Sequence, residues 1–142
     1  MPVRHTLVIP SATRYLSKVR KFISTHALNA NLSDEAISEL RLAVDEACSN
    51  VIEHAYQGKP NEKIHLTMTI ETTRIIVQIR DRGFAFNENT YQKPNLIKLS
   101  RNRKSGGFGV DIIRRLMDQV EYHTNGEINE IKLIKRIRSH WD

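Results

Sequence analysis

The 142-residue chain is poor in cysteine and in long apolar runs, and each shortage excludes a class of protein. Its single cysteine, Cys48, has no partner for an internal disulfide, so a small disulfide-stapled scaffold is excluded. The longest apolar run near the start is Leu7-Val8-Ile9, which Pro10 ends; it is too short for a signal-peptide core or a bilayer span. We therefore expect a cytoplasmic protein with no membrane partner.

What the chain does have is the composition of an ordinary globular domain. Hydrophobic residues make up 39% and charged residues 27%, a balance typical of folded rather than disordered chains. The length fits a single domain over 1–142. A chain of this size buries enough surface to fold without disulfides or a structural metal.

Charge is distributed unevenly along the chain. The formal net charge is +6, yet residues 1–33 contain no acid, and the charged residues of 34–53 are all acidic except Arg41. This segregation fits acidic protein surfaces and phosphate groups. Nucleic-acid binding is the alternative that the net charge raises. The chain lacks a helix-turn-helix pattern and a basic face interleaved with aromatic residues, so we expect no direct nucleic-acid partner.

Hydrophobic periodicity divides the chain into strands and helices. Residues 64–70 and 75–79 alternate apolar and polar side chains, as strands with one buried face do. A long helix is predicted between Ser33, a good N-cap, and Gly58. The full predicted order is strand 3–9, a helix from 13, helix 33–58, strands 64–70 and 75–79, a helix after 109, and a hairpin of 120–124 and 128–137 that turns at Asn125-Gly126.

This order predicts an α+β two-layer sandwich, with a mixed, mostly antiparallel sheet and helices on one face. The strand alternation supports one covered face, because strands covered on both faces have continuous apolar runs. Basic residues alternate with apolar ones over 132–138, which fits an edge strand protected by charge. Residues 82–107 show no sustained period, and loops of that length are usually functional or disordered.

Glu46 and Asn50 are the first candidates for chemistry. They are four residues apart on the long predicted helix, so their side chains project from the same side. A carboxylate can accept a proton from a hydroxyl, and an amide oxygen can ligate Mg²⁺. For this pair alone, the alternative is a polar helix edge in solvent.

Asp81-Arg82-Gly83 directly follows an alternating strand and is the second candidate. A carboxylate at a strand end can accept a hydrogen bond from an exocyclic amine, and the glycine permits a tight turn close to a ligand. The alternative is an ordinary surface turn, because Asp and Gly are common turn residues.

The third candidate is Ser105-Gly106-Gly107-Phe108-Gly109, which opens a predicted helix. Free backbone N–H groups at a helix start bind anions, and glycines let a phosphate approach. The alternative is a flexible hinge. The segment is not a P-loop, because no GK[ST] follows, and it is not a dinucleotide fingerprint, because it does not follow a strand within a βαβ unit.

Taken together, these motifs resemble a known family. The segments LRLAVDEACSNVIEHAYQG, VQIRDRGFAF and KSGGFGVDIIRRLMDQVEY are similar to the three ATP-site boxes of the GHKL superfamily, which includes gyrase, the heat-shock chaperone, histidine kinases and MutL. Within it they are most similar to the small anti-sigma-factor serine kinases of the RsbW and SpoIIAB type, over nearly the whole chain. The resemblance implies a Bergerat-type ATP-binding fold.

The resemblance also implies roles for residues of this chain. Glu46 would be the catalytic base, Asn50 would hold Mg²⁺, and Asp81 would receive the adenine amino group, with Gly83 lining the pocket. Residues 82–107 would form an ATP lid. The remaining ATP-binding set lies in and after this lid: Arg101, Lys104, Ser105, Gly107, Phe108 and Gly109, with Arg103 as a further lid cation that could reach the terminal phosphate.

The implied function is an ATP- and Mg²⁺-dependent serine/threonine kinase that acts as an anti-sigma factor. It would sequester a sigma factor, phosphorylate an anti-anti-sigma (STAS-domain) antagonist, and form a homodimer. The chain departs from many relatives at Phe84-Ala85-Phe86, where they have a further glycine or a proline. A second hypothesis therefore stays open: an ATP-dependent partner-binding module without significant kinase activity.

Overall fold

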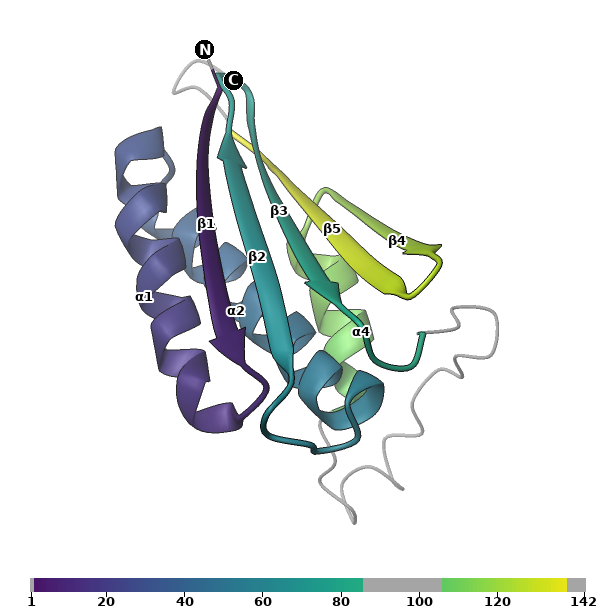
Figure 1. Ribbon diagram of the computed structural model, residues 1–142. Coiled ribbons are helices and arrows are strands. Elements are labelled where there is room, and N and C mark those ends of the chain that lie inside the picture. The colour runs from purple at the N-terminus through teal and green to yellow at the C-terminus, as the bar shows by residue number, and fades with distance from the viewer. Residues whose placement is uncertain (1, 86–105, 138–142) are drawn as a thin grey trace.

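The computed structural model describes residues 2–85 and 106–137 (Figure 1). Its strands are β1 (Val3–Pro10), β2 (Lys63–Ile70), β3 (Arg74–Asp81), β4 (Gln119–Asn125) and β5 (Ile128–Arg136). Its α-helices are α1 (Leu16–Ala27), α2 (Asp34–Asn50) and α4 (Gly106–Leu116). Short 3-10 turns flank α1 on both sides, at Thr13–Tyr15 and Leu28–Ala30. A π turn at Val51–Ala55 follows α2.

The strands form one five-stranded sheet in the order β1-β2-β3-β5-β4, and the helices lie on one of its faces (Figure 1). The predicted two-layer α+β fold is confirmed, and all four strand pairings of the described residues are antiparallel. The prediction of an edge strand near the C-terminus is wrong. β5 pairs with both β3 and β4, so its alternating basic residues lie inside the sheet, and the edges are β1 and β4.

The helix α2 packs against both α1 and α4. It begins as predicted: the Ser33 hydroxyl accepts a hydrogen bond from the Ala36 backbone nitrogen at 3.1 Å, which satisfies one of the free donors of the first turn. Its inner stripe is buried and packs on the apolar face of the sheet, through Ile37, Leu40, Ala43, Val44, Ala47 and Cys48.

The end of this helix differs from the prediction of one helix running to Gly58. Regular α-helix stops at Asn50 and a π turn follows, in which the Tyr56 nitrogen donates to the Val51 carbonyl at 2.9 Å. The chain then leaves through two positive φ angles, 52° at Gln57 and 79° at Gly58, the conformation that glycine favours. Single π turns inside helices are often found at functional sites.

Lys135 of β5 shows which way α4 runs. Its ammonium donates to the Leu116 carbonyl at the end of α4, at 2.6 Å, and forms an ion pair with Glu39 in the first half of α2. The two helices therefore run in opposite directions, and α4 begins near the end of α2 and of β3 (Figure 1). This start is Gly106, four residues before the start predicted after Gly109. None of the helices in residues 2–85 and 106–137 is long and apolar enough to cross a membrane.

Candidate functional site

Asp81 ends β3 as a buried carboxylate on the helix-covered side of the sheet, with 6% of its surface exposed. Its Oδ1 accepts two hydrogen bonds, from Asn129 Nδ2 and from the Gly83 backbone nitrogen, both at 2.9 Å. Burial raises the pKa of Asp81 above its ordinary value, and these two hydrogen bonds act in the opposite direction. Among the described residues no hydrogen bond reaches Oδ2, so this oxygen is available to an outside donor.

The turn after Asp81 lies directly on the π turn. The Phe84 nitrogen donates to the Ala55 carbonyl at 2.8 Å. A Cβ at position 83 would overlap the same carbonyl and lie 2.9 Å from the Ala55 Cβ. Only a glycine fits between the two backbones, so Gly83 is required here by close approach.

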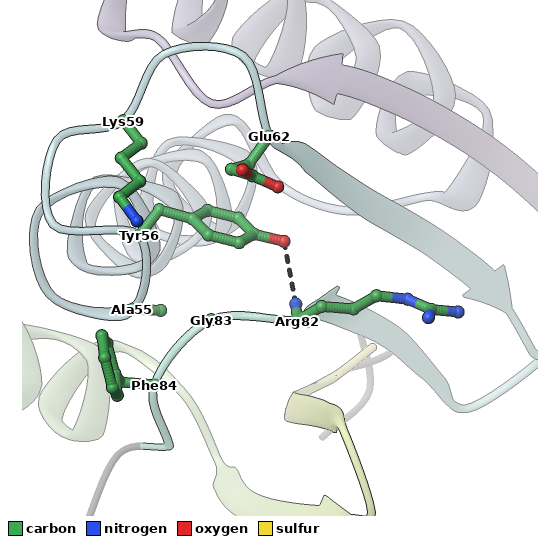
Figure 2. Close-up of a pocket in the computed structure, with 7 residues that line it drawn as sticks. All are labelled: Ala55, Tyr56, Lys59, Glu62, Arg82, Gly83 and Phe84. Atoms are coloured by element: carbon green, nitrogen blue, oxygen red, sulfur yellow. Dashed lines mark hydrogen bonds between the residues drawn. The ribbon is translucent and has the colours of Figure 1, made fainter.

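Tyr56 joins the turn after Asp81 to the start of β2. Its hydroxyl accepts a hydrogen bond from the Arg82 backbone nitrogen at 2.8 Å and donates one to the Lys63 carbonyl at 2.6 Å. The ring lines a cavity of about 270 Å³. Figure 2 shows the ring among the other lining residues, with its hydroxyl against the Arg82 nitrogen. The cavity is lined by Ala55, Tyr56, Lys59, Glu62, Arg82, Gly83 and Phe84.

Glu46 is half-buried on α2, one helical turn before Asn50. Burial raises the pKa of its carboxyl, and the negative charges of Asp45 and Glu53 raise it further. Asp45 itself is paired with Arg20 at 2.7 Å, whereas Glu46 has no hydrogen bond or ion pair within residues 2–85 and 106–137. A carboxylate with a raised pKa and free oxygens has the properties of a general base.

Asn50 carries an unsatisfied acceptor. Its Oδ1 atom is buried and has no hydrogen-bond partner among the described residues. A buried acceptor without a partner costs free energy, so such an atom in a folded protein points to a missing ligand. Mg²⁺ takes oxygen ligands and is usually held by one or two protein groups together with phosphate oxygens and water. The amide of Asn50 therefore fits a Mg²⁺ ion that is bound together with a nucleotide.

The structure brings several of the sequence-predicted residues to one end of the molecule. Gly83 lies against the π turn that directly continues from Asn50, and Asp81 is two residues before it at the end of β3. The first turn of α4, which holds Gly107, Phe108 and Gly109, begins at the same end (Figure 1). Arg101, Arg103, Lys104 and Ser105 lie outside the described residues, as does most of the lid predicted over 82–107, namely positions 86–105. Gly106 and Gly107, predicted as the end of this loop, belong to α4.

Sequence reasoning missed two residues of this region. Asn129 is 48 positions from Asp81, and only the register of β3 on β5 places the two opposite each other. Tyr56 lies within the motif around Glu46 and Asn50, but its hydroxyl reaches the Arg82 turn only because of the π turn. Neither contact has a local sequence signal, since both depend on long-range pairing.

Comparison with known proteins gives the class first. A model of the family described as the histidine kinase-like ATPase domain matches residues 9–135. Two solved structures share the fold. The first holds the RsbU and RsbW domains of a Mycobacterium tuberculosis protein (TM-score 0.66, 15% identity, 98% of this chain and 33% of that one). The second is a blue-light activated histidine kinase of Erythrobacter litoralis (TM-score 0.59, 16% identity, 91% of this chain and 42% of that one).

Curated relatives narrow the class further. The serine-protein kinase RsbW of Listeria monocytogenes is 31% identical over 126 residues, which are 85% of this chain and 80% of that protein. The RsbW of Bacillus pumilus is 28% identical over 126 residues, 84% of this chain and 78% of that protein. The chain belongs to the histidine kinase-like ATPase family and, within it, to the RsbW serine-protein kinases.

Proposed function

We propose that this protein binds ATP between α2, the end of β3 and the start of α4, and transfers the γ-phosphate to a serine or threonine of a partner protein. The observation that carries the proposal is the juxtaposition of three groups: a buried strand-end carboxylate, a half-buried acid one helical turn from an unsatisfied amide, and a glycine-rich helix start. Membership of the RsbW kinases supports the same activity.

Asp81 is the proposed contact for the adenine base. Its free oxygen accepts a hydrogen bond from the exocyclic amine of adenine. Guanine presents a carbonyl at that position, and two acceptors that face each other in a buried pocket cost binding free energy. Gly83 keeps the backbone next to Asp81 close to the π turn.

Glu46 is the proposed general base, which takes the proton from the attacking hydroxyl. Mg²⁺, held by Asn50 and the phosphates, would supply charge neutralisation during transfer. The phosphates would be bound by backbone amides at Gly107, Phe108 and Gly109, together with Ser105 and the lid cations Arg101 and Lys104. Catalysis would then consist mainly of positioning and charge stabilisation.

The proposed biological role is a partner switch in the cytoplasm. One partner is a sigma factor that the protein, as a homodimer, holds inactive, and the other is a STAS-domain antagonist that receives the phosphate. The acid-free N-terminal segment and α1 are the proposed dimer surface. An ATP-dependent binding module without significant kinase activity is the second candidate, and the exposed ring of Phe84, which lines the cavity, favours it as a partner contact.

The test combines the isosteric substitution Glu46→Gln with γ-labelled ATP and a STAS-domain antagonist. We expect ATP affinity within about twofold of wild type and a rate of transfer lowered by about 10²- to 10⁴-fold, because general-base catalysis contributes on that scale. Glu35→Gln, in the exposed first turn of the same helix, is the matched control. Equal rates in Glu46→Gln and wild type would rule out the base assignment, and ATP binding with no labelled antagonist in wild type would select the second candidate.

A further inference from the structure

The side-chain amide of Asn129 makes three hydrogen bonds around the proposed adenine contact. Its Nδ2 donates to Asp81 Oδ1 at 2.9 Å and to the Gly83 carbonyl at 2.8 Å. Its Oδ1 accepts a hydrogen bond from the Thr124 hydroxyl at 3.2 Å. Both amide hydrogens and one oxygen lone pair are used, so the orientation of the amide is fixed by its neighbours.

The sheet register places these groups together. Asn129 lies opposite Asp81 in the β3–β5 pair and opposite Thr124 in the β4–β5 pair. All three side chains are on the helix-covered face, because residues directly opposite in an antiparallel pair project to the same side. A row across three strands therefore ends on the Asp81 carboxylate.

We propose that Asn129 is a positioning residue that sets the base selectivity of this site, by holding the Asp81 carboxylate and the Gly83 carbonyl in fixed positions. The proposal rests on the proposed function, in which Asp81 receives the adenine amine. Asn129 occupies Oδ1 and leaves Oδ2 as the one oxygen that faces an incoming base. The same amide nitrogen also binds the Gly83 carbonyl, and so holds the turn that lies against the π turn.

The fixed orientation has a consequence for discrimination between bases. A carboxylate free to rotate can turn away from the carbonyl of guanine and lessen the repulsion. A carboxylate held by Asn129 cannot do so without losing a hydrogen bond between a charged acceptor and a half-buried donor. Selectivity for ATP over GTP is therefore expected to depend on Asn129 as well as on Asp81.

The test is isothermal titration of ATP and of GTP, each with Mg²⁺, into the full chain and its variants. Asn129→Ala removes the donor, and we expect about a 10- to 100-fold loss of ATP affinity with a smaller loss for GTP, so that the ATP/GTP ratio falls. Thr124→Val leaves the hydrogen bond from Asn129 to Asp81 in place but removes the hydroxyl that holds the Asn129 amide oxygen. We expect this variant to lose only about 2- to 5-fold in ATP affinity.

Asn129→Asp adds a readout that a purely structural role would not change. Two carboxylates in hydrogen-bond contact cannot both be charged at low cost, so they share a proton, and that proton replaces the amide bridge. As the pH rises and the shared proton leaves, we expect ATP affinity to fall about tenfold relative to wild type at the same pH. Asn125→Asp, which puts the same charge at the exposed end of β4, should follow wild type.

Each outcome decides the proposal. A lower ATP/GTP ratio in Asn129→Ala, with the pH-dependent loss in Asn129→Asp, supports it. Unchanged affinity, selectivity and pH response in these variants overturn it, while Asp81→Asn and wild type still report on the nucleotide site itself. If wild type binds no ATP, the proposed function fails instead. If Asn129→Asp does not fold, the base ratio of Asn129→Ala decides alone.

Discussion

Gly83 lies directly against the backbone carbonyl of Ala55, so that the turn leaving β3 and the π turn following α2 touch backbone to backbone. The contact joins positions 55 and 83, which are 28 residues apart in the chain. It brings the Asp81 carboxylate to the end of the helix that bears Glu46 and Asn50. The geometry of the proposed nucleotide site depends on this contact.

Gly83→Ala is expected to damage both stability and ATP binding. The added methyl overlaps backbone atoms that cannot rotate away, and overpacking of this kind costs about 1–3 kcal/mol. Thermal unfolding and titration calorimetry measure the two effects. Gly126→Ala is the control: its φ of 63° makes an L side chain cost about 1 kcal/mol, but the space around it is open, so ATP affinity should not change. Equal ATP affinity in Gly83→Ala and wild type would contradict the close-approach argument.

Asn50→Leu separates function from stability. The substitution removes a buried acceptor that has no partner among the described residues, so we expect the ligand-free protein to gain about 1 kcal/mol, or about 2–4 °C in melting temperature. ATP binding should at the same time lose its dependence on Mg²⁺. Differential scanning fluorimetry and calorimetry with and without Mg²⁺ give both values, and Asn61→Leu, at an exposed amide, controls for the substitution itself. Retention of the full Mg²⁺ effect would argue against Asn50 as a ligand.

The rate of phosphate transfer should fall at low pH because of Glu46. A base must be ionised to act, and since burial and two like charges raise the pKa of Glu46, the fall begins at higher pH than for an ordinary glutamate. Removal of one like charge in Glu53→Gln favours the ionised form, so the acid limb of the kcat profile should move to lower pH. Glu35→Gln, in the first turn of α2 and distant from Glu46, should leave the acid limb of the kcat profile in place. An unmoved limb in Glu53→Gln would show that another group controls the profile.

Lys135→Met should destabilise the packing of α4 on α2. The lysine side chain is only 12% exposed, and its loss leaves Glu39 and the Leu116 carbonyl without their shared donor. We expect a loss of about 1–3 kcal/mol in the free energy of unfolding, measured by urea denaturation. In a Glu39→Gln background the same substitution should cost less, because the two side chains are coupled. Lys132→Met, on the same strand but the other face of the sheet, is the control.

Local patterns in the sequence were sufficient to predict most of the elements. The alternation in β2 and β3, the Ser33 cap and the hairpin signal at Asn125-Gly126 each depend on neighbouring residues. The two strands, the cap and the hairpin are confirmed. The hairpin turns one position later than predicted, at Gly126-Glu127, because Asn125 still pairs with Ile128. The position of β5 was not predictable in this way. Its basic alternation is compatible with an edge, and only its pairing with β3 shows that it lies inside the sheet.

The candidate site divides along the same boundary between local and long-range information. Glu46 and Asn50 share a helix face by spacing alone, and Asp81 was placed at a strand end by the alternation before it. Asn129 could not be found, because its role depends on which residue of β3 it faces. The π turn also has no recognisable signature here, since the Tyr56 hydrogen bonds that accompany it reach distant parts of the chain, Lys63 of β2 and Arg82 in the turn after β3.

That wider turn limits how the segment can change. Removal of one residue between Asn50 and Tyr56 would restore tidy turns of 3.6 residues, and would also swing the tyrosine ring by about 100° around the helix axis. The ring would then face away from the strand ends that its hydroxyl now ties together. In this chain a fully regular helix is therefore incompatible with the hydrogen bond between Tyr56 and Arg82 after β3, and the native length of the segment preserves that hydrogen bond.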